Sequence, residues 1–387
     1  MTGDTKLTCT AIIPTYNRAR YIGEAIESLL AQTRKLDQII VVNDGSTDDT
    51  LSVLDRYADR IEIISKVNGG KSTAINMAIP QARGDCIWVF DDDDVALPDA
   101  LQRHLDALEK DPQAGFTYSP VLVGHSGDDG RIVVQHETRL WKVDRDEFLI
   151  RMMEHCFIHG QPAVVIRTDC LKQIGLFDER LVRSQDYEIV LRLARHYLPA
   201  RIEEPTFIQR RHSGPRGTSV QTYSSTDPFT PWSKYNRIFI RELLDDLPLA
   251  SYVRKSDTFN QRTALIQRFV IATRHGILEH AERDLVRIVE GGDDLTDEER
   301  RILLRSLTHF TALREVGARS CARLARLCRG RIGRQIRVTM AKGLIYDMIA
   351  SARQRRFSEV SRMMPRTAAL VGIAGTMELI AEKLQRT

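Results

Sequence analysis

The sequence lacks the cysteine pattern of a disulfide framework or a zinc site. Its six cysteines are scattered along 387 residues, and none stands in a Cys-x-x-Cys pair, the spacing that marks many such sites. Long apolar runs are also missing, since no uninterrupted stretch approaches the roughly 18 to 20 residues that span a bilayer. Residues 1–6 lead into an apparent strand and not into the apolar core of a signal peptide. We therefore expect a cytoplasmic globular protein with free thiols.

Three ligand-binding motifs are absent as well. GlyGlyLysSer at 69–72 resembles the end of a P-loop, but that pattern needs a glycine where this chain has Ser65. No Gly-x-Gly-x-x-Gly follows the first expected strand, which excludes a Rossmann-type dinucleotide turn. The aspartates at 91–94 lack both the glycine at loop position 6 and the closing glutamate of an EF-hand. The aspartates at 91–94 therefore form a carboxylate cluster that none of these three motifs explains.

Charge is unevenly distributed along the chain. Residues 301–387 contain 18 Lys plus Arg and 5 Asp plus Glu, a net +13, whereas the first 300 residues contain 38 and 47, a net −9, which together give the overall +4. A basic tail of this kind indicates a polyanionic partner, for which an anionic membrane surface and nucleic acid are the generic candidates. A solvated helical face rich in arginine explains the charge equally well.

In the first third of the chain, segments with the hydrophobic pattern of strands alternate with segments that have the pattern of helices. Apolar, β-branched runs predict strands at 8–13, 38–43, 61–65 and 86–90, and between and after them helices at 21–32, 47–57, 71–79 and 98–109. This order predicts an α/β fold with βαβ units and a parallel sheet. Each strand is followed by polar residues, and ligands of such sheets bind at the carboxyl ends of the strands.

The rest of the chain divides into a mixed part and a helical part. Strands are expected at 116–123, 131–135 and 163–167, and helices at 145–155 and 185–196. Beyond about residue 228 the strand signal disappears, and from 243 onward we expect amphipathic helices separated near 291–294, Gly330, Gly333 and Pro365. The Ser/Thr/Pro-rich stretch 222–232 predicts a boundary between an α/β domain, 1–225, and a helical, arginine-rich region, 226–387.

Four consecutive aspartates, Asp91 to Asp94, follow the strand at 86–90. Carboxylates this close raise one another's pKa values, so they stay ionised together only with compensation such as a divalent cation. Mg²⁺ or Mn²⁺ held by one or two carboxylates completes its shell with water and phosphate oxygens. Helix capping by Asp94 or Asp99 is the alternative, but it explains one or two of these carboxylates and not the run.

At this point the sequence resembles family 2 glycosyltransferases with the GT-A fold, across roughly residues 7–220. The resemblance is carried by the order and spacing of ProThrTyrAsnArg (14–18), AspGlySerThrAspAsp (44–49), AsnGlyGly with AlaIleAsnMetAla (68–78), ArgGlyAsp (83–85) and PheAspAspAspAspValAlaLeuPro (90–98). It implies an NDP-sugar donor bound across the strand ends and a DxD motif, here Asp91-Asp92-Asp93, that meets the ribose and a metal.

The resemblance assigns the nucleotide contacts to three loops. It implies that Tyr16 packs on the base, in a loop that Pro14 and Thr15 shape. It also implies that Asp44 accepts a hydrogen bond from the base edge, which favours UDP because uracil N3–H is a donor; an Asx turn at AspGly is the alternative role. Lys71 is expected to reach the base or a phosphate, unless it is solvated surface.

The remaining assignments concern the ribose, the metal and the acceptor. Asp91 or Asp92 is expected to hold the ribose and Asp93 the metal. In SerGlnAspTyrGlu (184–188) Asp186 matches the general base, although many relatives have a glutamate where this chain has Gln185; a carboxylate stabilising the helix N-terminus is its alternative role. ArgArgHisSerGly (210–214) resembles the loop whose histidine completes the metal shell. The resemblance thus adds His212 as a metal ligand and Arg210, Arg211 and Ser219 as diphosphate contacts.

Together these features predict a metal-dependent inverting glycosyltransferase using Mn²⁺ or Mg²⁺. The acceptor would be a hydroxyl of a glycan or a lipid-linked molecule in polysaccharide or glycolipid synthesis, and Asp186 would take its proton in an in-line displacement. The basic helices would contact the inner face of an anionic membrane, mediate self-association or cover the catalytic domain; no nucleic acid is expected. The rival interpretations are a sugar nucleotidyltransferase, which needs a basic Gly-rich loop that ProThrTyrAsnArg lacks, and a non-catalytic NDP-sugar-binding module.

Overall fold

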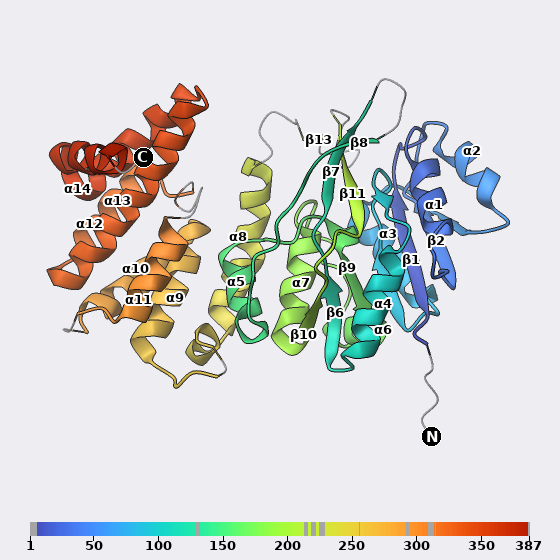
Figure 1. Cartoon of the computed structure of the whole chain (residues 1–387), viewed down its shortest axis with the longest axis horizontal. Coiled ribbons are helices and arrows are strands. Elements are labelled where there is room, and N and C mark those ends of the chain that lie inside the picture. The colour runs from blue at the N-terminus through green and yellow to red at the C-terminus, as the bar shows by residue number, and fades with distance from the viewer. Residues whose placement is uncertain are drawn as a thin grey trace. The chain divides into compact units, whose positions relative to one another are not determined.

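The structure is a computed structural model that describes residues 6–127, 132–212, 216–217, 222–223, 229–254, 256–291, 294–308, 313 and 315–385. The chain forms two compact units, Met1–Tyr235 and Asn236–Thr387, and each is described by itself (Figure 1). The division falls within helix α8, Phe229–Asp246, close to the boundary expected at 225/226. That the two parts fold as separate domains stays a prediction.

The first unit is built on a seven-stranded mixed sheet in the order β10-β6-β9-β4-β1-β2-β3. Strands β1 to β4 run parallel to one another, as the βαβ pattern predicts, and β9 is antiparallel to both of its neighbours, β4 and β6. Strands β1, β2 and β4 are buried along their whole length because both faces of the sheet are covered. The strands are β1 Cys9–Thr15, β2 Gln38–Asn43, β3 Glu62–Ser65, β4 Cys86–Val89, β6 Ala114–Tyr118, β9 Val164–Arg167 and β10 Leu198–Arg201.

Helix α1 of the first unit is amphipathic. In α1 the buried residues Ile22, Ala25, Ile26 and Leu29 recur at the helical period and form one apolar stripe. The α-helices that lie wholly within this unit are α1 Ile22–Leu30, α2 Thr50–Leu54, α3 Lys71–Ala78, α4 Ala100–Lys110, α5 Phe148–Glu154, α6 Thr168–Ile174 and α7 Gln185–His196. The α/β architecture expected from the sequence is therefore confirmed.

A second, four-stranded sheet has the order β5-β11-β7-β8. Its strands are β5 Val95–Ala96, β7 Leu122–Ser126, β8 Ile132–Glu137 and β11 Phe207–Arg211, and a separate pair is formed by β12 Arg216–Gly217 and β13 Thr222–Tyr223. Because β5 comes directly after the four aspartates and pairs with β11, this sheet brings residues near 210 beside them. The sequence did not predict β5 or β11.

The expected strand at 116–123 is wrong, because the structure has β6 and β7 there, in two different sheets. Pro120 lies between them and has no N–H for a ladder hydrogen bond, so one continuous strand cannot form. Strand β10 was missed because Pro199 breaks the strand pattern. By contrast, β2 and α7 have the bounds expected from the sequence.

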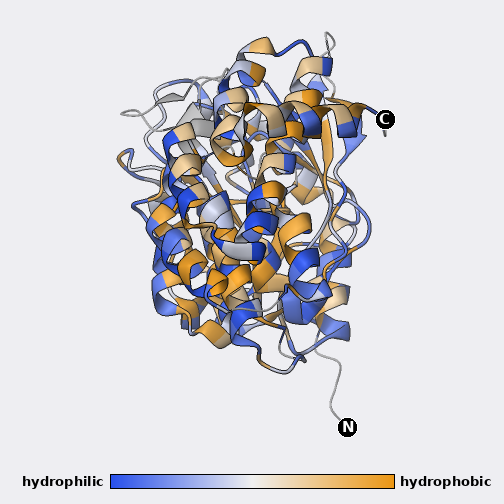
Figure 2. Ribbon diagram, turned by 90° about the vertical axis from the view of Figure 1, so that its left-hand side faces the viewer, coloured by the Kyte–Doolittle hydropathy of each residue, from blue (hydrophilic) through white to orange (hydrophobic). Residues whose placement is uncertain are grey.

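The second unit is helical. Its helices are the end of α8 and α9 Gln261–Arg274, α10 Leu278–Val289, α11 Asp297–Leu307, α12 Ala318–Leu327, α13 Gly330–Arg353 and α14 Phe357–Gln385. Neither Gly333 nor Pro365 separates helices as expected: Gly333 lies inside α13, and α14 continues through Pro365 and kinks at Gly372, where φ is 77°. The helix ribbons in Figure 2 are banded in orange and blue. Among the described residues, no helix combines the length and the apolar character that a membrane span requires.

Candidate functional site

The polar residues that follow β1, β2, β3 and β4 meet at one edge of the sheet. Thr15 at the end of β1 pairs with Asn43 at the end of β2, and Lys66 after β3 donates its backbone N–H to the carbonyl of Asn43. After β4, the backbone N–H of Phe90 donates to the carbonyl of Ile12. Residues that lie up to about 75 positions apart are thereby collected at the carboxyl ends of parallel strands, where such sheets bind ligands.

Asp44, directly after β2, is 3% exposed. Its Oδ1 accepts from Lys66 Nζ at 2.6 Å and from the backbone N–H of Gly69 at 2.9 Å, and its Oδ2 accepts from Asn68 Nδ2 at 3.2 Å and from the N–H of Gly70 at 2.7 Å. Four donors fill the acceptor positions of one carboxylate. In this arrangement Asp44 holds the loop after β3 against β2, and a hydrogen bond from a nucleobase would have to displace one of these donors.

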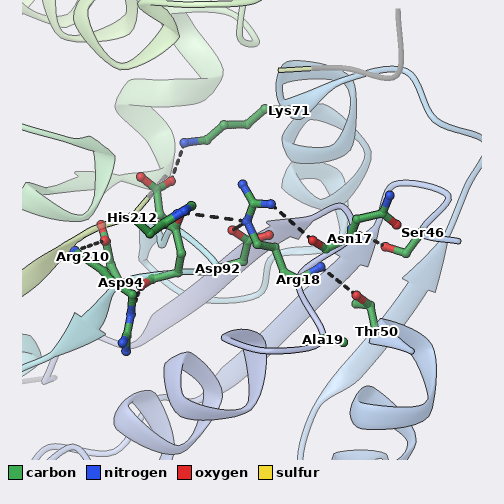
Figure 3. A network of polar contacts seen from close by, with 12 residues as sticks. Asn17, Arg18, Ala19, Ser46, Thr50, Lys71, Asp92, Asp94, Arg210 and His212 are labelled. Carbon is green, nitrogen blue, oxygen red and sulfur yellow. Dashed lines mark hydrogen bonds and ion pairs between the residues drawn. The ribbon is translucent and has the colours of Figure 1, made fainter. Parts of the chain in front are cut away.

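Each of the first three carboxylates of the aspartate run lies close to a different basic side chain. Asp91 forms an ion pair with Lys71 at the start of α3. Asp92 Oδ1 lies 3.4 Å from Nε of Arg18, and Asp93 Oδ2 lies 2.8 Å from Nε2 of His212. Figure 3 shows Lys71, Arg18, Asp92 and His212 around this cluster, and His212 comes from the segment that follows β11.

Asp94 and Arg210 form the base of the cluster. Both are 2% exposed, and Oδ1 of Asp94 accepts from the backbone N–H of Arg210 at 2.9 Å. The guanidinium of Arg210 donates to the carbonyl of Asp93 at 3.0 Å and to Ser126 Oγ at 2.6 Å, and it pairs with Glu24 in α1. Arg210 thus holds the aspartate loop in place. The sequence predicted a different role for it, contact with the diphosphate.

Burial and mutual repulsion shift the pKa values of the cluster. Burial, followed by the charge of Asp93, raises the pKa of Asp92 to about 7, although Arg18 acts in the opposite direction. Burial alone would lower the pKa of Lys71, but Asp91, together with Asp186 and Asp92, raises it above its ordinary value. A further cation bound among these carboxylates would relieve the repulsion that raises the pKa of Asp92.

Asp186 lies in the first turn of α7, preceded by Ser184 with a left-handed φ of 65°. Its Oδ1 accepts from the N–H of Tyr187 at 2.9 Å. Burial raises the pKa of Asp186; Lys71 lowers it and Asp91 raises it, so all three belong to one electrostatic group. A carboxylate with a raised pKa that stands beside a cluster of charged groups is a candidate proton acceptor.

The other predicted residues occupy less informative positions. Pro14 and Thr15 are the last residues of β1 and are buried, and Tyr16 begins the following loop and is partly exposed. Arg211 ends β11 and is exposed. Ser219 lies outside the described residues. The predicted roles of these residues stay predictions.

Three residues of the site were not predicted as such. Arg18 faces Asp92, Lys66 pairs with Asp44 at 2.6 Å, and Asn76 binds the segment before α7 through the carbonyl and the N–H of Phe177, both at 2.9 Å. Arg18 and Asn76 lie within the motifs ProThrTyrAsnArg and AlaIleAsnMetAla. Their place in these motifs was the one feature of the sequence that could have marked them as site residues. Their partners lie far along the chain, so spacing alone could not name them.

The donors at Asp93 and His212 fit a divalent cation. A carboxylate and an imidazole suit Mn²⁺, and the carboxylate also suits Mg²⁺. Within the described part of the chain, no group of three or more His, Cys, Asp or Glu side chains is arranged to hold a metal ion. A cation at this position would therefore take its remaining ligands from water and from a bound phosphate, as such ions do.

Part of the first unit matches a known protein family. A family model described as glycosyl transferase family 2 matches residues 10–175, which include the strand-end loops and the aspartate run. Residues 10–175 are therefore similar to glycosyl transferase family 2. Asp186 and His212 lie beyond the matched segment.

Relatives and one solved structure agree with the family and the fold. The chain is 35% identical over 185 residues to an uncharacterized glycosyltransferase of Rickettsia typhi, covering 48% of this chain and 58% of that protein. It is 32% identical over 186 residues to chondroitin synthase of Pasteurella multocida, covering 47% and 18%. The crystal structure of S. aureus TarS 1–349 in complex with UDP-GlcNAc superposes with a TM-score of 0.50 at 17% identity, covering 94% of this chain and 91% of that one. It supports a GT-A-type α/β fold. The chain spans about half the length of the first curated relatives it matches.

Proposed function

We propose that the protein is a metal-dependent inverting glycosyltransferase. It would transfer a sugar from an NDP-sugar, with UDP as the favoured nucleotide, to a hydroxyl of a glycan or lipid-linked acceptor in polysaccharide or glycolipid synthesis. The observation that carries this proposal is the contact of 2.8 Å between Asp93 and His212, which lie 119 residues apart. A carboxylate and an imidazole brought together beside a strand-end nucleotide loop are suited to a cation that carries a diphosphate.

Each side chain has a task in the displacement. Lys71 and Arg18 supply positive charge close to the place of the diphosphate, and Asp91 or Asp92 is suited to hold the ribose hydroxyls. Asp186 accepts the proton of the attacking acceptor hydroxyl, which raises the nucleophilicity of that oxygen as it approaches the anomeric carbon in line. Asp93 and His212 would hold Mn²⁺ or Mg²⁺. The cation, when bound, neutralises charge on the leaving diphosphate.

The decisive experiment is calorimetric titration of the full chain with UDP, GDP, TDP and CDP, with and without Mn²⁺. We expect one nucleotide, UDP, to bind only with Mn²⁺, and Asp93→Ala to abolish that binding. The matched control is Asp169→Ala, which removes a carboxylate that is 90% exposed in α6, and it should bind as the wild type does. Failure of all four nucleotides to bind with Mn²⁺ would refute the donor site.

A second measurement separates a transferase from its rivals. With the bound nucleotide's sugar donor and an alcohol acceptor, the transferase should release UDP and form a glycoside with inverted anomeric configuration, followed by NMR. A nucleotidyltransferase would instead make NDP-sugar from a nucleoside triphosphate and a sugar phosphate. A non-catalytic module would bind the donor and leave it intact, and Asp186→Asn would then change nothing.

The helical unit would provide contact with an anionic membrane surface. Arg319, Arg323 and Arg326 recur at the helical period on the exposed side of α12, whereas Cys321 and Leu324 are buried on the other. The test is sedimentation with anionic phosphatidylglycerol vesicles and with neutral phosphatidylcholine vesicles. Binding to the anionic vesicles alone, weakened by glutamine at these three positions, is expected; concentration-dependent self-association without lipid binding would favour an oligomer interface instead.

A further inference from the structure

Arg18 lies against the two carboxylates at the centre of the proposed donor site. Its Nε atom is 3.4 Å from Oδ1 of Asp92 and 3.9 Å from Oδ2 of Asp93, and the three side chains are 15%, 14% and 15% exposed. Figure 3 shows the guanidinium beside Asp92, with a hydrogen bond to Asn17. A guanidinium stays charged at any physiological pH, so Arg18 is a permanent counter-charge for this pair.

The backbone of Arg18 is fixed, and its side chain is held in part by a hydrogen bond from Nη1 to the carbonyl of Asn17 at 3.2 Å. Its N–H donates to Thr50 Oγ1 at 2.8 Å, and its carbonyl accepts from the N–H groups of Tyr21 and Ile22 at 2.9 and 3.0 Å, at the start of α1. These bonds hold the Cα position from two elements. To move from one anion to another, the guanidinium would rotate about its side-chain bonds and give up the hydrogen bond to Asn17.

The contact with the carboxylates is loose for a charge-assisted pair. Distances of 3.4 and 3.9 Å exceed the roughly 2.7 to 2.9 Å of a strong N⁺–H···O⁻ hydrogen bond. A diphosphate offers this guanidinium paired oxygens that match its planar fork. Arg18 therefore has more to gain from a phosphate than from Asp92 and Asp93.

Arg18 and a divalent cation also compete for the same oxygen. Asp93 Oδ2 is the atom that contacts His212, and the Nε of Arg18 lies 3.9 Å from it. Two cations placed on one partly buried carboxylate repel each other strongly. The cation would bind best when the guanidinium has moved away.

We propose that Arg18 is an internal counter-ion that stays on the Asp92–Asp93 carboxylates until a nucleoside diphosphate arrives, and then moves to the diphosphate. Divalent cation and donor would thereby bind together and not one after the other. This inference rests on the proposed function, because it takes Asp93 as a metal ligand. It makes Arg18 a donor-binding residue that couples two binding events, and by linkage the coupling is the same in either direction.

The test is direct Mn²⁺ binding, followed by the EPR signal of free Mn²⁺, with and without saturating UDP. The full-length variants are Arg18→Gln, Arg18→Lys and, as a matched control, Arg20→Gln, which removes an exposed arginine in the same loop. Without UDP, Arg18→Gln should bind Mn²⁺ at least about fivefold more tightly than the wild type, the lower end of typical coupling between sites. Its UDP affinity should fall, Arg18→Lys should lie between, and Arg20→Gln should match the wild type.

The counter-ion role of Arg18 and the proposed metal-dependent function would be refuted by different results. If wild type and Arg18→Gln bind Mn²⁺ equally without UDP, or the variant binds it more weakly, the counter-ion role is refuted while UDP-dependent Mn²⁺ binding leaves the proposed function standing. If the wild type takes up no Mn²⁺ even with UDP, the metal-dependent function fails and this inference with it. Thermal unfolding of each variant monitors the fold, and Arg18→Lys keeps the test valid if the glutamine variant is unstable.

Discussion

Asp186 stands in the first turn of α7, and its environment sets the pH at which it can accept a proton. Burial raises its pKa and Lys71 opposes that shift. A general base works only when deprotonated, so kcat should fall as the pH is lowered through this raised pKa, above the value of about 3.9 of an ordinary aspartate. Replacing Lys71 by methionine removes the opposing cation, so the acid limb of the kcat profile should move to higher pH.

The measurement is kcat against pH at saturating donor for wild type and Lys71→Met. An acid limb that stays in place, or moves to lower pH, would show that Lys71 does not act on the base. Because donor saturation removes the effect of weakened nucleotide binding, the shift reports on the bound enzyme.

Asp186→Asn should lower kcat by about 10²- to 10⁴-fold, the usual contribution of a general base. The amide keeps the size of the side chain but cannot take the proton, so calorimetric UDP affinity should stay at the wild-type value. Asp169→Asn, at a carboxylate 90% exposed in α6, is the control and should retain full activity. A fall in kcat below twofold for Asp186→Asn would assign this residue to helix stabilisation instead.

Single residues of the site could be predicted only where a motif named them. Asp93 and His212 were predicted as ligands of one metal ion, which stays a prediction, and the structure places them 2.8 Å apart. Arg18 and Lys66 were missed as partners of Asp92 and Asp44 because these contacts depend on how three loops meet after folding. Arg210 shows the same limit, since its place under the aspartate loop follows from the pairing of β11 with β5, two strands that the sequence pattern does not indicate.

At the scale of secondary-structure elements, β1 and β4 approach each other at their N-terminal ends through Gly84. A Cβ added at Gly84 would lie 2.6 Å from the backbone N of Thr10 and 2.8 Å from the carbonyl carbon of Cys9, which are rigid backbone atoms. Gly84→Ala should therefore lower the free energy of unfolding by about 1–3 kcal/mol. Urea unfolding measures this, and Gly317→Ala, where a Cβ meets nothing within 4 Å, is the control, with an expected change below about 0.5 kcal/mol.

Equal urea midpoints for the two glycine variants would contradict this expectation, because β1 and β4 would then make room for the added Cβ without loss of stability.

The strands of the first unit were not predicted equally well from the sequence. Strands β1, β2 and β4 are buried, largely apolar segments and were found, whereas β10 contains Pro199 and β11 ends in two arginines. Tertiary pairing made strands of these two segments against their local composition.

At the scale of the whole molecule, the buried pair Arg268–Asp284 tests whether the helical unit folds on its own. Nε and Nη2 of Arg268 in α9 donate to the two carboxylate oxygens of Asp284 in α10 at 2.8 and 2.6 Å, and the Asp284 side chain is 0% exposed. Asp284→Ala leaves a buried cation without its partner, which costs about 3–5 kcal/mol. Asp297→Ala, at a side chain 91% exposed in the first turn of α11, is the control and should change little.

If the two units are separate domains, Asp284→Ala should unfold the helical unit at lower urea while Mn²⁺-dependent UDP binding persists, since the described residues proposed to bind the donor lie within Met1–Tyr235. Circular dichroism would then record an early transition that the binding signal does not follow. Loss of UDP binding in step with that transition would mean that the chain unfolds as one cooperative unit, because the catalytic fold then depends on the helices that follow it.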